Sequence, residues 1–71
     1  MERKQVTSSN IYSIGYDPDK LILEVEFKNG GIYQYNKIPL KIYQRLMAAN
    51  SHGKFLDTYI KKGGYTFKKI R

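Results

Sequence analysis

Residues 21–35 of the chain read LILEVEFKNGGIYQY, and this stretch decides the fold. Up to residue 28, large apolar side chains alternate with mostly charged ones, which is the period-2 pattern of a strand with one buried face. Asn29-Gly30-Gly31 supplies the positive φ values of a hairpin turn, and residues 32–36 return as the next strand. The stretch therefore predicts an antiparallel β-hairpin.

The loop length of this hairpin determines where Tyr33 and Tyr35 point. A two-residue loop sets both tyrosines opposite glutamates on the solvent face, whereas a three-residue loop over residues 28–30 sets them opposite Val25 and Leu23. A one-residue slip turns every side chain to the other face, so only one register can hold. We favour the three-residue loop, because it gathers the large side chains on one apolar face.

The segments before the hairpin contribute one further strand. Residues 11–16 are expected as a short strand, joined to the hairpin by a turn at Asp17-Pro18. Residues 1–7 carry no apolar alternation, and we expect them to be a flexible lead-in.

Two helices are expected after the hairpin. Pro39 suits the first turn of a helix whose apolar positions recur at helical spacing. Ser51 is a natural N-cap for a second helix, which the pair Gly63-Gly64 ends. The expected fold class is α+β: a three-stranded antiparallel β-meander packed with two helices, with residues 65–70 as an optional short fourth strand.

Length and composition limit the function. The 71 residues suffice for one small domain, residues 1–71, and leave little room for a deep catalytic cleft. The chain has no cysteine and a single histidine, which argues against a disulfide framework and against a metal site. We therefore expect no enzyme, no cofactor and no metal.

The positive charge is concentrated in the second half of the chain. Residues 1–36 carry four Lys or Arg against five Asp or Glu, a net charge of −1, whereas residues 37–71 carry nine against one, a net charge of +8. Clustered cations attract and steer anionic partners, so we expect a phosphate-bearing ligand. No stretch reads as a signal peptide or a bilayer span, and we expect a cytoplasmic protein with no membrane partner.

The most suggestive local site is Ser51-His52-Gly53-Lys54, at the start of the second predicted helix. Free backbone N–H groups at a helix start attract anions, Gly53 would let a phosphate approach, and Lys54 would add charge. An ordinary N-cap with a turn glycine is the alternative.

Ser51, His52 and Asp57 are the residue types of a hydrolase triad, but neighbours at a helix start do not face one another. The further candidates for phosphate contacts are Lys41, Arg45, Lys61, Lys62, Lys68, Lys69 and Arg71.

The chain contains seven tyrosines, and aromatic side chains beside basic residues can stack on nucleobases. The candidates for base stacking are Tyr33, Tyr35, Tyr59 and Tyr65. In the register favoured above, Tyr33 and Tyr35 belong mostly to the core instead. An exposed tyrosine surface could equally form a homodimer or a higher homo-oligomer, which would help a chain with so small a core.

A series of spaced elements runs through the chain: Ser8-Ser9-Asn10-Ile11, Gly15-Tyr16-Asp17, Leu23-x-Val25-x-Phe27, Tyr33-Gln34-Tyr35, Ile38-Pro39, Tyr43 and Ala49-x-Ser51-x-Gly53-Lys54-Phe55. Together they resemble the KTSC domain, which is named for its occurrence at the C-terminus of some lysyl-tRNA synthetases and also occurs as a stand-alone bacterial or phage protein. The resemblance covers about residues 5–65. It implies a small α+β fold and a role in RNA binding.

Three functional hypotheses follow. The first is a non-catalytic binding module for a phosphate-bearing ligand, with RNA as the first choice. The second is an oligomeric protein that binds or sequesters a small anionic nucleotide or nucleotide signal. The third is an accessory domain that binds an acidic protein partner.

Overall fold

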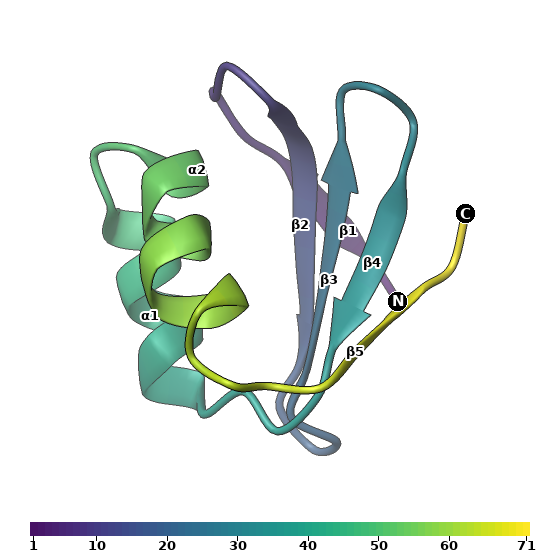
Figure 1. Ribbon diagram of the computed structural model, residues 1–71, viewed down its shortest axis with the longest axis vertical. Helices are drawn as coiled ribbons and strands as arrows, with labels where there is room; N and C mark the ends of the chain where they lie inside the picture. Colours follow the sequence, from purple (N-terminus) through teal and green to yellow (C-terminus); the bar gives the residue numbers. More distant parts are fainter.

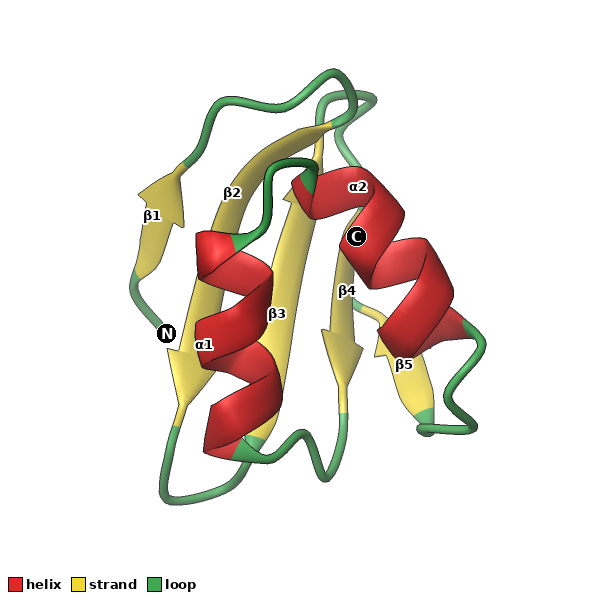
Figure 2. Ribbon diagram, turned by 90° about the vertical axis from the view of Figure 1, so that its left-hand side faces the viewer, coloured by secondary structure: helices red, strands yellow, loops and turns green.

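The protein consists of one antiparallel sheet with its helices on a single face (Figures 1 and 2). The computed structural model describes residues 1–71. The strands lie in the sheet in chain order: β1 (Arg3–Gln5), β2 (Ile11–Asp17), β3 (Ile22–Phe27), β4 (Ile32–Tyr35) and β5 (Phe67–Lys69). The helices are α1 (Leu40–Ala48), α2 (His52–Phe55) and the π-helix η1 (Leu56–Lys61), which directly continues α2.

The α+β class, the antiparallel sheet and the two helical segments agree with the sequence-based expectation, but the number of strands does not. The sheet has five strands, where three or four were expected. Residues 3–5, expected within a flexible lead-in, form β1 and pair with residues 13–15 of β2. The optional last strand forms as β5 on the free edge of β4.

The register of the central hairpin is the one set by the three-residue loop. Val25 pairs with Tyr33 and Leu23 pairs with Tyr35, as predicted. The backbone N–H of Phe27 donates to the carbonyl of Gly31 at 2.8 Å, which leaves residues 28–30 as the loop. Both tyrosines therefore face the helices, together with Leu23, Val25 and Phe27 of β3.

The core lies between this face of the sheet and the helices. Figure 2 shows α1 in front of β2 and β3, and α2 in front of β4. Tyr16 of β2 stacks on Tyr43 of α1 with ring centroids 4.6 Å apart, and its hydroxyl donates to the carbonyl of Ile38, which fixes α1 against the sheet. The buried core residues are Ile11, Ile14, Leu23, Val25, Tyr35, Ile38, Leu46, Leu56 and Ile60.

The helix boundaries follow the predicted signals. Pro39, expected in the first turn, is instead the extended N-cap residue directly before α1. The hydroxyl of Ser51 accepts a hydrogen bond from the backbone N–H of Lys54, the capping role expected of it. Gly64 follows the second helical segment with a φ of 82°. None of the helices is long and apolar enough to cross a membrane.

The opposite face of the sheet carries a polar network and no helix. The glutamates of the hairpin, Glu24 and Glu26, were expected on its solvent face, but Glu24 is only 6% exposed. Arg3 of β1 forms an ion pair with Glu24 and donates to the hydroxyl of Ser13 at 3.0 Å, and Gln34 donates to the other carboxylate oxygen of Glu24 at 2.7 Å. The pairing of β1 with β2 brings Arg3 over this carboxylate and buries it.

Candidate functional site

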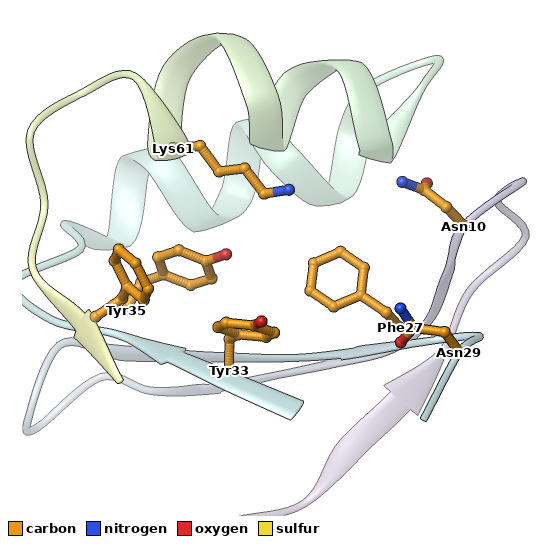
Figure 3. Close-up of a pocket in the computed structure, with 7 residues that line it drawn as sticks. Asn10, Phe27, Asn29, Tyr33, Tyr35 and Lys61 are labelled. Carbon is orange, nitrogen blue, oxygen red and sulfur yellow. The ribbon is translucent and has the colours of Figure 1, made fainter. Parts of the chain in front are cut away.

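An aromatic pocket opens between β4, β5 and the end of η1 (Figure 3). Its volume is about 520 Å³, within the range of small-molecule binding sites. We call it the aromatic pocket, and its lining residues are Asn10, Phe27, Asn29, Tyr33, Tyr35, Lys61 and Phe67.

Four aromatic residues line the pocket, and the rings of three of them, Tyr33, Phe27 and Phe67, form its open part. Figure 3 shows the ring of Tyr33 low in the pocket, beside the sheet. The ring of Phe27 stands nearly perpendicular to it, at an interplanar angle of 82° and a centroid distance of 5.7 Å. The ring of Phe67 lies 6.1 Å from that of Tyr33 on another side. A planar ligand could therefore stack on one ring and contact the edge of another.

Lys61 brings a positive charge to this aromatic surface. Its side chain reaches from the end of η1 over the pocket, and its Nζ lies 5.2 Å from the ring centroid of Phe27, within the range of a cation–π contact (Figure 3). Asp57, one turn earlier, pairs with the same Nζ at 3.2 Å. Both side chains of this ion pair are about half exposed, so an anionic ligand can compete with Asp57 in solvent.

A second hollow of about 370 Å³ adjoins the pocket and shares Asn29 and Tyr33 with it. Its cations come from the end of the chain. Lys69 pairs with Tyr33 across the β4–β5 ladder, so the two side chains project from the same face of the sheet. We call this hollow the basic hollow, and its lining residues are Asn29, Gly30, Gly31, Tyr33, Lys69 and Arg71.

The cations around the two hollows differ in their freedom to bind a phosphate. The guanidinium of Arg71 donates to Glu26 at 3.3 Å and to the carbonyl of Gly30 at 3.4 Å, yet its side chain is 65% exposed. Lys69 forms no ion pair within the protein. It is therefore the cation that can meet a ligand phosphate without giving up an acidic partner.

Tyr35 lies at the back of the aromatic pocket and is 3% exposed. Burial, and to a smaller extent the charges of Tyr33 and Asp57, raise its pKa to about 12. A raised pKa means that the fold favours the neutral phenol. This contribution to stability is complete below the unfolded pKa near 10 and is lost as the pH rises towards 12.

Burial also raises the pKa of Tyr16, so we expect two tyrosines to ionise later than an exposed tyrosine when the folded protein is titrated with base, and the step near pH 12 belongs to Tyr35. Phenolate absorbance should show a last step near pH 12 that disappears in Tyr35→Phe. In denaturant, the tyrosines of the wild type should titrate together near the ordinary value of about 10. A phenolate step near pH 12 that persists in Tyr35→Phe would contradict this assignment.

The four predicted stacking tyrosines have different surroundings. Tyr33 lines both hollows, whereas Tyr35 is too deeply buried to offer a ring face to a base, in keeping with its predicted core role. Tyr59 is 47% exposed but packs on Phe55, with centroids 4.6 Å apart, away from the pocket. Tyr65 is half-buried against the core. Only Tyr33 among the four thus offers a ring face in a hollow beside basic side chains.

In the Ser51–Lys54 segment, internal contacts occupy most of the predicted anion-binding groups. Ser51 caps the N–H of Lys54, and Nδ1 of His52 lies 2.9 Å from the carbonyl oxygen of Leu46. Gly53 is buried, and only the side-chain amine of Lys54 is free of such a contact. The structure therefore favours the ordinary N-cap here.

The predicted basic residues do not share one face. Arg45 lies over the rings of Phe55 and Tyr59 at 5.5 and 5.2 Å, on the helical layer. Lys68 pairs with Gln34, so it projects from the sheet face opposite to Lys69. Lys41 and Lys62 are exposed and line neither hollow. Of the predicted cations, the structure brings together only Lys61, Lys69 and Arg71.

The three residue types of a hydrolase triad are also kept apart. His52 is held by the carbonyl of Leu46, and Asp57 pairs with Lys61. No group of three or more His, Asp or Glu side chains is arranged to hold a metal ion.

Reasoning from the sequence missed the pocket residues Phe27, Phe67, Asn10 and Asn29. Phe27 was read as part of the apolar alternation of a strand, and Asn29 as part of the hairpin turn. Phe67 was placed only in an optional strand. Its position two residues before Lys69 was a signal, because residues i and i+2 of a strand share a face.

Comparison with known proteins identifies the family. The family model described as "KTSC domain" matches residues 7–65. The chain belongs to the KTSC domain family. The structure is also similar to the crystal structure of a KTSC domain protein from Yersinia pestis, with a TM-score of 0.92 and 46% identity over 99% of this chain and 97% of that one.

Related sequences occur both as small proteins and inside a larger one. A protein of Stutzerimonas stutzeri is 39% identical over 99% of both chains, and a protein of Tsukamurella paurometabola is 39% identical over 79% of this chain and 84% of its own. A lysine–tRNA ligase of a Nostoc species is 34% identical over 87% of this chain, which corresponds to 11% of the ligase.

Two of the elements that resemble the family meet in this KTSC domain. A Cβ at position 53 would lie 2.6 Å from Oδ1 of Asn10, so only glycine permits this approach. The contact joins the segment before β2 to the start of α2. This close approach lies beside the aromatic pocket, which Asn10 helps to line.

Proposed function

We propose that this KTSC domain is a non-catalytic module that binds single-stranded RNA at the aromatic pocket and the adjoining basic hollow. A base stacks in the aromatic pocket, and its phosphates lie along Lys61, Lys69 and Arg71. The observation that carries the proposal is that the two hollows share Tyr33 and Asn29. Aromatic and cationic groups thus form one continuous surface, which suits a ligand with planar and phosphate parts.

Charge and family add support. The net charge of +7 favours a polyanionic partner. A lysine–tRNA ligase that contains a related segment acts, by its name, on an RNA. Because both hollows are formed by residues of a single chain, the proposed site needs no second copy.

RNA affinity should fall with increasing salt. If all three cations contact phosphates of a single strand, the slope of log affinity against log salt is about −2. Lys69→Gln should bring the slope closer to zero by about 0.7, because RNA binding then neutralises one phosphate fewer and releases correspondingly fewer counterions. Fluorescence anisotropy of a labelled RNA over a salt series measures both slopes.

Lys62→Gln is the matched control, because Lys62 is exposed and lies in neither hollow. It should leave the slope nearly unchanged. A flat salt dependence of the wild type, or equal effects of the two variants, would rule out this interface.

A free nucleotide is the second candidate ligand, because the aromatic pocket has the volume of a small-molecule site. Calorimetry with mononucleotides separates the two candidates. Saturable one-to-one binding that RNA does not compete away favours the nucleotide, whereas displacement of the nucleotide by RNA favours the RNA module.

A further inference from the structure

The aromatic pocket has one end that the proposed function does not yet use. Asn10, from the turn before β2, and Asn29, from the β3–β4 loop, lie at this end beside Phe27. Figure 3 shows the amide nitrogens of both side chains directed into the pocket. Each is therefore placed to hydrogen-bond to the edge of a base stacked there.

Hydrogen bonds within the protein define which way each amide points. Oδ1 of Asn29 accepts from the backbone N–H of Gly31 at 2.9 Å. Oδ1 of Asn10 accepts from the hydroxyl of Ser8 at 3.3 Å. The same hydroxyl oxygen accepts from the backbone N–H groups of Asn10 and Ile11, at 3.4 and 3.3 Å, so its own proton is available to donate to this amide oxygen. Both amide oxygens are thus engaged, and the two NH₂ groups are left without a partner in the protein.

This end of the pocket therefore offers donors and no amide acceptor. Lys61, which reaches over the neighbouring ring, is also a donor only. A base that lies here must present acceptors. Guanine carries two adjacent acceptors, O6 and N7, whereas adenine places its N6 amino donor where guanine has O6. An adenine amino group would face the amide donors without forming a hydrogen bond.

We propose that the aromatic pocket selects a purine with a 6-keto group, guanine, over adenine, through the amide donors of Asn10 and Asn29. This selectivity rests on the proposed RNA-binding function and names the base that it recognises. Guanine and adenine have similar size and similar stacking surfaces. Their discrimination therefore comes from the hydrogen bonds at the edge of the ring.

The test uses single-stranded RNAs that are identical except for one base, which is guanine, inosine or adenine in an otherwise constant pyrimidine sequence. Inosine keeps the 6-keto oxygen and lacks the 2-amino group of guanine. By anisotropy, the guanine and inosine RNAs should bind about 5- to 30-fold more tightly than the adenine RNA, the effect of one to two hydrogen bonds.

Asn29→Asp tests the donor directly. Its carboxylate can still accept from the N–H of Gly31, so the hairpin loop is kept, but the donor towards the base becomes an acceptor. The ratio of guanine to adenine affinity should fall to about one or below. Asn50→Asp, at an exposed site outside the pocket, adds the same charge and should leave the ratio unchanged.

The possible outcomes separate the two proposals. Binding of all three RNAs with equal affinity overturns the base selectivity and leaves the RNA module intact. A preference for guanine but not for inosine also overturns it, because recognition would then act through the 2-amino group. Failure of every RNA to bind at low salt overturns the RNA module and the selectivity together.

Discussion

Phe67→Ala is expected to weaken RNA binding by about 5- to 150-fold, the effect of one lost stacking contact of roughly 1–3 kcal/mol. Phe67 is 59% exposed and contributes its ring to the aromatic pocket, with its centroid 6.1 Å from that of Tyr33. Because more than half of the residue is already open to solvent, its truncation removes a ligand contact rather than a core side chain. The fold should remain stable, as thermal unfolding will show.

Tyr59→Ala is the matched control for this loss. Tyr59 is also an exposed aromatic residue, 47% open to solvent, but it lies on the helical layer with Phe55 and Arg45 and does not line the pocket. It should change RNA affinity by less than about twofold. A larger loss of RNA affinity in Tyr59→Ala than in Phe67→Ala would place the RNA interface on the helices. Equal RNA affinities of the wild type and both variants would exclude stacking at either place.

Arg3→Ala is expected to lower the free energy of unfolding at neutral pH by about 2–3 kcal/mol. Removal of the guanidinium leaves Glu24, which is 6% exposed, as a buried carboxylate with only Gln34 as a partner. This is less than the roughly 3–5 kcal/mol of a fully buried pair, because the Arg3 side chain is 26% exposed. For so small a domain this is a large fraction of the total stability.

The dependence of this loss on pH distinguishes charge from packing. Burial tends to raise the pKa of Glu24, but the hydrogen bonds from Gln34 and Arg3 and the charge of Arg3 outweigh it, so the pKa lies below its usual value. The carboxylate therefore stabilises the wild type above its unfolded pKa of about 4.3, and this contribution is lost as the pH falls through the lower folded pKa.

In Arg3→Ala, burial should prevail and raise the pKa of Glu24. The difference in stability from the wild type should then shrink as the pH is lowered from near 7 to about 4, because Glu24 becomes protonated in the variant. Urea unfolding at both pH values measures this. An equal loss of unfolding free energy at both pH values would assign the effect to the packing of the aliphatic part of the Arg3 side chain. Lys4→Ala, in the same strand and without an ion pair, should change stability by less than about 0.5 kcal/mol.

Local signals were sufficient for the centre of the fold. The alternation around Val25 and the turn residues at Gly30 determined the hairpin and its register, because only one register places the large side chains on a single face. Ser51 was recognisable as an N-cap since its hydroxyl needs only the N–H three residues later. Such interactions lie within a few residues and are therefore visible in the order of the residues.

The edges of the sheet could not be found in this way. β1 has no apolar pattern, and it pairs with β2 where Gly15 has no side chain: a Cβ there would lie 2.6 Å from the carbonyl oxygen of Glu2. Arg3 then reaches Glu24, 21 residues away. The burial of Glu24 follows from this contact, which no local pattern contains.

The sequence by itself determined the fold class, the hairpin register and the concentration of positive charge in the second half of the chain. Only the tertiary structure decided which of those charges meet aromatic rings. The pairing of β5 with β4 places Phe67 and Lys69 beside Tyr33 and sends Lys68 to the other face. The physical reason is that a binding surface depends on contacts between distant segments, whereas charge and periodicity are properties of neighbours along the chain.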